Sequence, residues 1–311
     1  MIGFAAKADL GALKNLYRAC FADPEEYIDA FFAFAMEKYP PAVYRVGDSI
    51  AAMAFMLPAP VQLGKGTEKG IYFYALATRP DFQGRGIMSE LMTWCESYQR
   101  EQGVLFTTLV PGSESLFRFY EKRGYLTDFY ARICHVAAMP VCTAEFPTLT
   151  AKALFARRQA HFAGRELTLF RGEEAISFSL AVAAEGGGFA LDLGALVPGG
   201  YAVGFESEEK RVIRELGVKA NAFSTVFPHL GSKTGEKPLD IWLPDDYTMD
   251  RPCERRPFGM SKFIGETKDR ARPVSYTHLD VYKRQMYDQH LIFRGGVTPS
   301  DLLVLRRLLT V

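Results

Sequence analysis

The residues best placed to do chemistry form a short glycine turn, Gln83-Gly84-Arg85-Gly86-Ile87-Met88. The apolar and aromatic run Ile71–Ala77 before it has the composition of a buried strand, and apolar residues recur at helical spacing after it. Backbone N–H groups at a helix start have no partner within the helix, and the helix dipole places partial positive charge there. The two glycines let a phosphate approach the main chain, so the turn is a candidate pyrophosphate site with Arg85 as a charged partner.

The turn also has plainer interpretations, because two glycines before a helix occur in ordinary tight turns and Arg85 can be a solvated side chain. Its spacing fits neither GxGxxG for a dinucleotide nor GxxxxGK[ST] for a nucleoside triphosphate. Val104–Val110 is typical of a further strand, and a short helix then begins at Ser113 or Ser115 and ends at Gly124. This order of strand, glycine turn, helix, strand and helix strengthens the phosphate interpretation.

The turn and the later helix together resemble the GCN5-related N-acetyltransferase (GNAT) family. The coenzyme A loop of that family reads Q/R-x-x-G-x-G/A and is matched by residues 83–87, whereas Met88 departs from its last position. A later family segment, FYEKxGF, is matched by Phe119–Tyr125, and Ser113 stands where the family often has asparagine. The resemblance covers residues 1–137 and looks most like the enhanced-intracellular-survival type of acetyltransferase.

The resemblance implies transfer of an acetyl group from acetyl-CoA to a primary amine of a small molecule or peptide, by direct attack in a ternary complex. The loop then binds pyrophosphate, and backbone N–H groups near Leu76 and Ala77 donate to the thioester oxygen. Tyr120 is the candidate acid for the departing thiolate, since a phenol with a pKa of about 10 is a proton donor at neutral pH. Tyr120 can instead simply pack between helix and sheet.

No carboxylate lies on the strand Ile71–Ala77, so no general base is assigned. Because Met88 also departs from the loop pattern, a catalytically silent acyl-CoA-binding or interaction protein is an alternative. A third interpretation is a peptidyl or aminoacyl transferase that uses a carrier other than coenzyme A.

Composition limits the partners. The 311 residues suggest about two domains, and the net charge of +1 argues against nucleic acid or an anionic membrane as the main partner. No apolar run is long enough to span a bilayer, and the N-terminus lacks a signal-peptide pattern, so we expect a cytoplasmic protein. Its expected partner is a small-molecule amine, and a homo-oligomer is compatible with the sequence. The five cysteines are odd in number and lack CxxC spacing, which favours reduced buried thiols and no metal.

We expect an α/β (α+β) acetyltransferase fold, a mixed sheet flanked by helices, over residues 1–137. The predicted elements are a strand over 2–6, a helix to residue 21, a second helix opened by Asp23-Pro24-Glu25-Glu26 with a capping acid, and a hairpin around Gly47-Asp48. Residues 58–70 are predicted as a loop and 126–137 as the last strand of this domain. The two opening helices border the acceptor site, as the resemblance implies, and their acids either attract a cationic amine or form a solvated face.

A second, degenerate acetyltransferase-like domain is expected over residues 138–273. Alternating apolar residues predict a strand over Ile176–Val182, and two further strands flank the turn Pro198-Gly199-Gly200. We also predict a helix over Ser207–Leu216 and a strand over Leu239–Leu243. No counterpart of the glycine loop is present, so this domain is expected to wall the acceptor pocket rather than bind coenzyme A.

Residues 274–285, VSYTHLDVYKRQ, have an unusual coding property. They can be encoded by a DNA that, with the preceding CT, is its own reverse complement and resembles two transposon adapter ends joined head to head. We interpret the segment as an assembly scar rather than a genuine polar loop and exclude it from fold reasoning, which also makes the tail 286–311 suspect.

Overall fold

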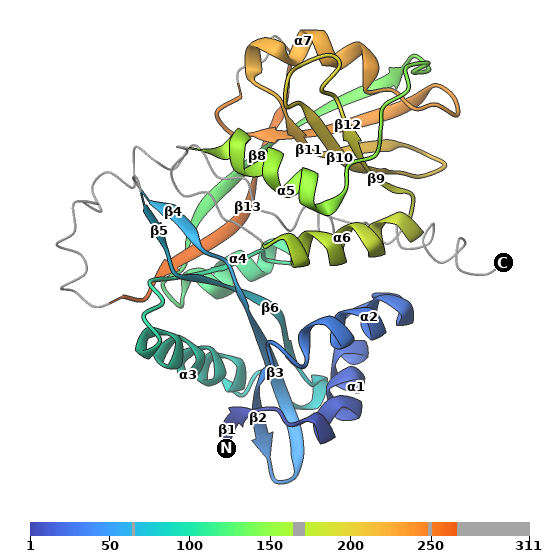
Figure 1. The fold of residues 1–311 in the computed structure, drawn as a ribbon. Coiled ribbons are helices and arrows are strands. Elements are labelled where there is room, and N and C mark those ends of the chain that lie inside the picture. Colours follow the sequence, from blue (N-terminus) through green and yellow to red (C-terminus); the bar gives the residue numbers. More distant parts are fainter. Residues whose placement is uncertain (64–65, 164–171, 248–250, 266–311) are drawn as a thin grey trace. The chain divides into compact units, whose positions relative to one another are not determined.

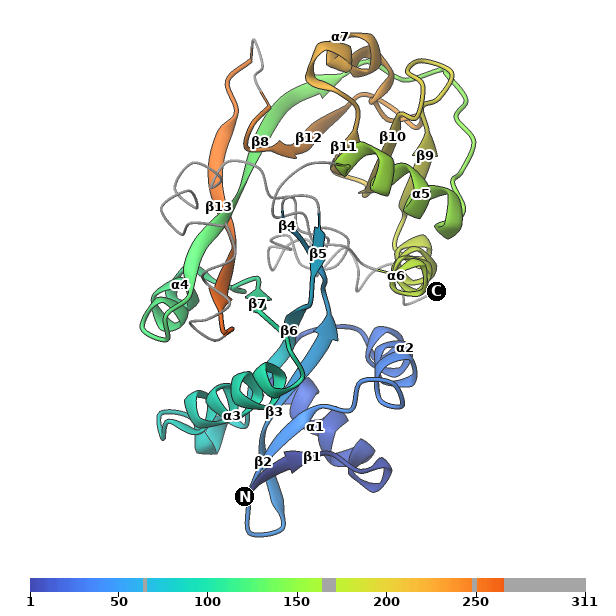
Figure 2. The same ribbon diagram turned by 60° about the vertical axis from the view of Figure 1, so that its left-hand side comes forward.

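The computed structural model describes residues 1–63, 66–163, 172–247 and 251–265. The predicted assembly scar and the suspect tail therefore lie outside the described residues. Contacts divide the chain into two compact units, whose elements are drawn in Figure 1 and Figure 2. Unit 1 holds Met1–Val61, Thr67–Leu126 and the described residues from Met260, whereas unit 2 holds Thr127–Gly259 with Gln62 and Gly66.

Unit 1 is a sheet with helices on both faces. Its main elements are β1 (Ile2–Phe4), α1 (Leu10–Cys20), α2 (Glu25–Ala35), β2 (Ala42–Val46), β3 (Ser49–Pro58), β6 (Gly70–Thr78), α3 (Ile87–Glu101), β7 (Phe106–Leu109) and α4 (Glu114–Glu121). The strand order is β1-β2-β3-β6-β7, antiparallel except for the parallel pair β6–β7. Beyond β7 the sheet continues with Met260–Phe263, the last residues of β13 (Glu254–Phe263).

The apolar faces of the helices explain this layering. In α2, buried Phe31 and Phe32 pack on Phe55 of β3, and each aromatic side chain contributes roughly 2–3 kcal/mol on burial. On the other face, Leu91 and Cys95 of α3 join a core cluster with β6 residues. Figure 1 shows α1 and α2 on one side of β3 and β6, and α3 on the other.

Most predictions for unit 1 are confirmed, with three corrections. Pro24, not Asp23, is the N-cap of α2, because Asp23 accepts a hydrogen bond from the Tyr17 hydroxyl instead. The predicted loop over 58–70 contains β4 (Val61–Leu63) and β5 (Gly66–Glu68), paired in a two-stranded sheet. The strand predicted over 126–137 exists as β8 (Leu126–Met139), but β13 rather than β8 lies beside β7.

Unit 2 repeats the order of unit 1. Its elements are α5 (Ala151–Phe162), α6 (Glu173–Glu185), β9 (Gly188–Asp192), β10 (Tyr201–Glu206), β11 (Arg211–Gly217), α7 (Phe223–Val226) and β12 (Lys237–Pro244), joined by β8 and the first residues of β13. In unit 2 the antiparallel strands β9, β10 and β11 are followed by β12, which pairs parallel to β11. In unit 1 the antiparallel strands β2, β3 and β6 are followed in the same way by β7, which pairs parallel to β6. In this order the short α7 stands where unit 1 has α3.

Two secondary-structure predictions in unit 2 are wrong. Ile176–Val182 lies in helix α6, where the buried residues Ile176 and Ser179 are spaced for one helical face and pack toward α5 and β9. Ser207–Leu216 is a turn followed by β11, whose residues are all buried. The prediction took Ser207 as a helix cap and Gly217 as the end of the helix, but Ser207 belongs to the turn before β11. Glu215 of β11 is paired inside the protein, where it accepts from Arg158 at 2.7 Å.

The expectation that all cysteines are reduced is also wrong. Cys134 of β8 and Cys253, directly before β13, form a disulfide across a sequence separation of 119 residues. The other three cysteines, Cys20, Cys95 and Cys142, are free thiols. Cysteine spacing could not reveal this pair, because only the fold brings the two segments together.

Candidate functional site

A β-bulge interrupts β6 directly before the glycine turn. The register with β3 shifts so that Ala75 and Leu76 together oppose one residue, and Ala75 has a φ of +49°. A left-handed backbone costs a non-glycine residue about 1–3 kcal/mol, and such strain clusters at functional sites. The parallel pairing of β6 with β7 covers only Gly70–Tyr72. Leu76 and Ala77 therefore follow the point where the two strands separate.

The glycine turn lies open at the start of α3. Gly84 and Gly86 have φ values of +76° and +78°, and Gly86 is the N-cap of the helix. A Cβ added to either glycine would meet no atom within 4 Å, so backbone conformation rather than crowding requires glycine here. Residues 83–86 are exposed, and within the described chain the N–H groups of residues 84–88 have no hydrogen-bond acceptor. Free donors at a helix N-terminus suit an anion.

Side chains around the turn fix its shape. Arg79 pairs with Asp81 through two hydrogen bonds of 2.6 and 2.8 Å, which lower the pKa of Asp81. Arg85 donates to the Asp81 carbonyl at 2.9 Å, and its guanidinium lies 5.1 Å from the centre of the Phe82 ring. Gln83 Nε2 donates to the Thr78 carbonyl at 3.0 Å, which joins the turn to the end of β6. Arg85 therefore stays beside the exposed N–H groups.

Tyr120 lies in the same hydrophobic cluster as the residues around the turn. It is 6% exposed, its ring packs edge-on against Phe119 and Tyr125, and the cluster includes Leu76, Ile87 and Met88. The structure therefore brings together the predicted acid, the end of β6 and the start of α3. Ser113 is the exposed N-cap of α4, with its Oγ 3.0 Å from Ser115 Oγ.

Arg123 connects the two helices that hold these residues, and the sequence analysis missed it. It donates through Nε to Ser89 Oγ in the first turn of α3 at 3.0 Å and through Nη1 to the Phe119 carbonyl at 2.5 Å. Its guanidinium lies 3.4 Å from the centre of the Phe119 ring. Burial lowers the pKa of Arg123, which still remains a cation at neutral pH. Arg123 falls on the variable position of the FYEKxGF match, so the motif gave no signal for it.

A buried polar network supports the other end of α3. Glu96, 6% exposed, accepts from the Tyr125 hydroxyl at 3.0 Å and from Lys262 Nζ at 2.5 Å, and Tyr125 also contacts Thr107 Oγ1 at 2.8 Å. Burial, and then the Glu96 charge, raise the pKa of Tyr125 well above its usual value. Because Lys262 comes from β13, the sequence offered no sign of this network.

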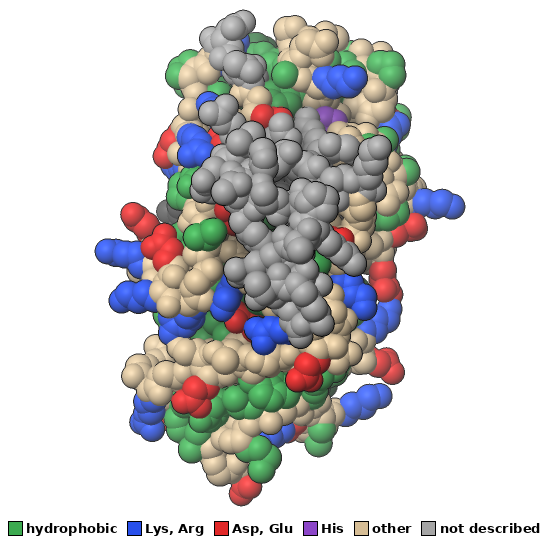
Figure 3. All heavy atoms as spheres, turned by 90° about the vertical axis from the view of Figure 1, so that its left-hand side faces the viewer, with side chains coloured by type: hydrophobic (Ala, Val, Ile, Leu, Met, Phe, Trp, Pro, Cys, Tyr) green, Lys and Arg blue, Asp and Glu red, His purple; other side chains and the backbone are tan. Residues whose placement is uncertain are grey.

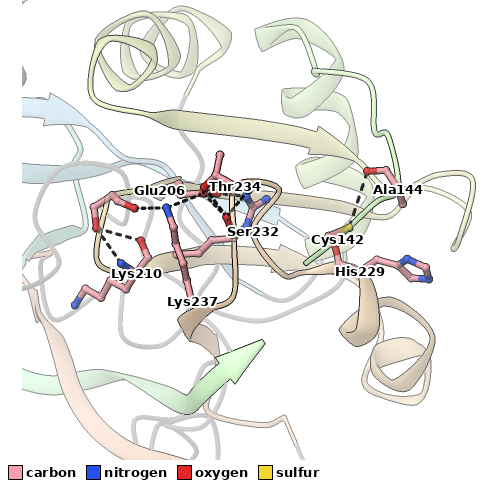
Figure 4. Close-up of polar contacts among 10 residues, drawn as sticks. Cys142, Ala144, Glu206, Lys210, His229, Ser232, Thr234 and Lys237 are labelled. Carbon is pink, nitrogen blue, oxygen red and sulfur yellow. Dashed lines mark hydrogen bonds and ion pairs between the residues drawn. The ribbon is translucent and has the colours of Figure 1, made fainter. Parts of the chain in front are cut away.

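A second polar cluster, in unit 2, is shown in Figure 4. Glu206 accepts from Arg211, from Lys237 at 3.2 Å and from the hydroxyls of Ser232 and Thr234. Burial raises the pKa of Glu206, but these four hydrogen bonds outweigh it and lower the value to about 2. A cavity of about 140 Å³ nearby is lined by Cys142 and aromatic side chains. The cluster holds the ends of β10, β11 and β12 together, which is a structural role.

The described residues contain no group of three or more His, Cys, Asp or Glu side chains arranged to hold a metal ion. Within the same residues, no helix combines the length and apolar character needed to cross a membrane. On the face shown in Figure 3, Lys and Arg side chains lie interspersed with Asp and Glu.

The open turn, the bulged strand and the helices around them all lie in a part of the chain that matches a known protein family. Residues 2–127 match the acetyltransferase (GNAT) domain family. The chain is 28% identical over 99 residues to the uncharacterized N-acetyltransferase YesJ of Bacillus subtilis (strain 168), a match of 29% of this chain and 55% of that protein. The chain thus spans about half the length of this curated relative.

Solved structures extend the likeness across both units. A probable N-acyltransferase from Enterococcus faecalis has a TM-score of 0.68 at 13% identity, covering 85% of this chain and 72% of that one. A GCN5-related N-acetyltransferase from Anabaena variabilis also has a TM-score of 0.68, at 15% identity and with the same coverage. Eis1 from Mycobacterium abscessus has a TM-score of 0.62 at 13% identity, covering 85% of this chain and 74% of that one. At these identities the likeness concerns the fold alone.

Proposed function

We propose that this chain is an acetyl-CoA-dependent N-acetyltransferase that acts, in the cytoplasm, on a primary amine of a small molecule or peptide. The observation that carries the proposal is the open glycine turn at the start of α3, next to the bulge in β6 and to Tyr120. A thioester of coenzyme A supplies an activated acyl group when it is bound. The protein binds and orients the two substrates and transfers protons.

The turn binds the pyrophosphate in this proposal. The free N–H groups of residues 84–88 donate to it, and Arg85 adds positive charge beside them. Met88, which departs from the family pattern, is half-buried and packs into the hydrophobic cluster, so it leaves the exposed face of the turn open. Ser113 contributes an exposed hydroxyl at the start of α4.

In this proposal, the acyl group binds where β6 and β7 separate. Backbone N–H groups near Leu76 and Ala77 polarise the thioester carbonyl, where the bulge turns the chain away from regular pairing. Tyr120 gives its hydroxyl proton to the departing thiolate and recovers a proton from water afterwards. Tyr120 is buried in the cluster against which Leu76 packs.

The proposal is tested by isothermal calorimetry of acetyl-CoA binding to the full chain and to Gly86→Glu. The introduced carboxylate is repelled by phosphate, and a side chain at a φ of +78° is strained, so saturable binding should be lost in this variant. The matched control is Gly11→Glu, which adds the same charge in α1 where a Cβ meets nothing within 4 Å. Circular dichroism melts of all three proteins establish that each is folded.

Thiol release on addition of amines then separates the enzyme from its alternative. A catalytically silent acyl-CoA-binding protein should bind acetyl-CoA but release no free thiol with any amine. If the folded parent chain does not bind acetyl-CoA at all, both proposals are wrong and a carrier other than coenzyme A becomes the better explanation.

A further inference from the structure

Three tyrosine hydroxyls and one carboxylate form a continuous hydrogen-bonded chain in unit 1. Tyr27 Oη of α2 contacts Tyr74 Oη of β6, which lies 3.2 Å from Tyr17 Oη of α1. Tyr17 in turn donates to Asp23 Oδ2 at 2.6 Å. The three tyrosines are at most 8% exposed, whereas Asp23 is half-buried. The chain therefore leads from the protein interior to a carboxylate in contact with water.

Tyr74, in the middle of this chain, lies at the bulge in β6. Tyr74 directly precedes Ala75, the residue with a φ of +49°. The Tyr74 ring packs on Phe31, 4.7 Å between centres, on the face of the sheet covered by α1 and α2. Tyr120 belongs to the cluster on the opposite face, with Phe73 and Leu76. The strand that contains Ala75 thus has the hydroxyl chain on one face and the cluster with Tyr120 on the other.

Asp23 differs in its contacts from the other acids at this corner. Glu25 accepts two hydrogen bonds from Arg18, at 2.5 and 2.7 Å, and Asp29 accepts from Lys14 at 2.6 Å. Those ion pairs lie on the exposed surface, whereas Asp23 accepts from a buried phenol. Tyr72, whose ring centre is 6.3 Å from that of Tyr74, is the further titratable side chain on the same strand.

The hydroxyls are the distinctive part of the tyrosine cluster. The rings pack among phenylalanines such as Phe21, Phe31 and Phe32, so phenyl rings would fill the same space. A buried hydroxyl is unfavourable unless it is hydrogen-bonded, and here each phenol supplies a partner to the next. Packing alone therefore does not account for three linked hydroxyls that end on a carboxylate.

We propose that Tyr27, Tyr74, Tyr17 and Asp23 form a proton relay for the attacking amine, an inference that rests on the proposed function. As the C–N bond forms and the C–S bond breaks, the amine N–H proton passes to the Tyr27 oxygen. Each phenol passes its own proton onward, and the last one reaches the Asp23 carboxylate, which returns it to water. The thiolate takes its proton from Tyr120, so each phenol and the carboxylate are regenerated.

The test compares kcat and KM for thiol release by the full chain, Asp23→Asn and Tyr74→Phe, with acetyl-CoA and two acceptors. The acceptors are 2-phenylethylamine, a basic alkylamine, and aniline, whose nitrogen becomes far more acidic on attack and needs less help from a base. We expect kcat with 2-phenylethylamine to fall about 100-fold in both variants at neutral pH, with a smaller loss for aniline and with recovery at alkaline pH. KM for acetyl-CoA should stay unchanged.

The matched control is Asp48→Asn, which removes the same charge from an exposed acid of the hairpin turn between β2 and β3, outside the relay, and should leave kcat unchanged. Equal losses with the two amines, or a loss that does not recover at alkaline pH, would mean that the hydroxyl chain is only structural. Unchanged kcat in both variants would also overturn the relay while leaving the proposed function intact. If the parent chain releases no thiol with any primary amine, the proposed function fails and the relay fails with it.

Discussion

Removing the ammonium of Lys262 should destabilise unit 1 by about 2–4 kcal/mol. In the folded protein its Nζ lies 2.5 Å from Glu96 Oε2, and the Glu96 side chain is only 8% exposed. Breaking a buried ion pair by removing one partner costs about 3–5 kcal/mol, because it leaves an uncompensated charge in a poorly solvated place. We use a lower range because the Lys262 side chain is 26% exposed, so water already screens part of the interaction.

The assay is urea unfolding of Lys262→Met followed by tryptophan fluorescence. The chain has two tryptophans, Trp94 in α3 of unit 1 and Trp242 in β12 of unit 2, so a Trp242→Phe background reports on unit 1. The double variant Glu96→Gln, Lys262→Met is the control, since it removes both charges and keeps an amide oxygen for Tyr125. It should recover most of the lost stability. A loss under 1 kcal/mol, or a double variant as unstable as the single one, would refute the buried-charge explanation.

Two further predictions concern unit 2. Glu206 has a folded-state pKa of about 2 against an ordinary 4.5, so its contribution to the free energy of unfolding is present above pH 4.5 and is lost as the pH falls toward 2. Because the group is partly exposed, we expect this contribution to be about 1–2 kcal/mol. Glu206→Gln should therefore flatten the acid side of a curve of stability against pH, and an unchanged curve would contradict the prediction. Thiol titration of the unreduced, denatured chain should find the three free cysteines, and titration after reduction should find all five. Reduction should lower the free energy of unfolding by about 2–4 kcal/mol, a loss that the double variant Cys134→Ala, Cys253→Ala should not show on reduction. Five thiols without reductant would restore the original expectation.

The parts of unit 1 that are built from local signals were predictable. The glycine turn, the helix after it and the hairpin at Gly47 each depend on a few neighbouring residues whose backbone preferences are strong. The strand after the turn and the helix that carries Tyr120 follow from apolar runs with clear boundaries. These are also the residues that form the candidate acyl-CoA site.

The errors in unit 2 come from interactions that are remote in sequence. The run from Ile176 alternates like a strand, but small residues at every second position also suit a helix, and packing on α5 and β9 decides between them. Before and within β11, Ser207 and Gly217 indicated the start and the end of a helix, whereas interactions with other elements, such as that of Arg158 with Glu215, accompany a strand there. The same reason hid the Tyr17–Asp23 chain: Tyr74, which links it to the bulge, is 57 residues from Tyr17.

The place of β13 has a consequence for the order in which the chain folds. The strand that pairs with β7, and the lysine that neutralises Glu96, are among the last described residues, after nearly all of unit 2 has been made. During synthesis from the N-terminus, one edge of β7 therefore stays unpaired while the intervening sequence leaves the ribosome. Such long-range pairing folds slowly and exposes strand edges to aggregation. Until β13 has been synthesised, the sheet that carries the candidate acyl-CoA site is incomplete. We therefore expect the chain to depend most on chaperones at this stage of its synthesis.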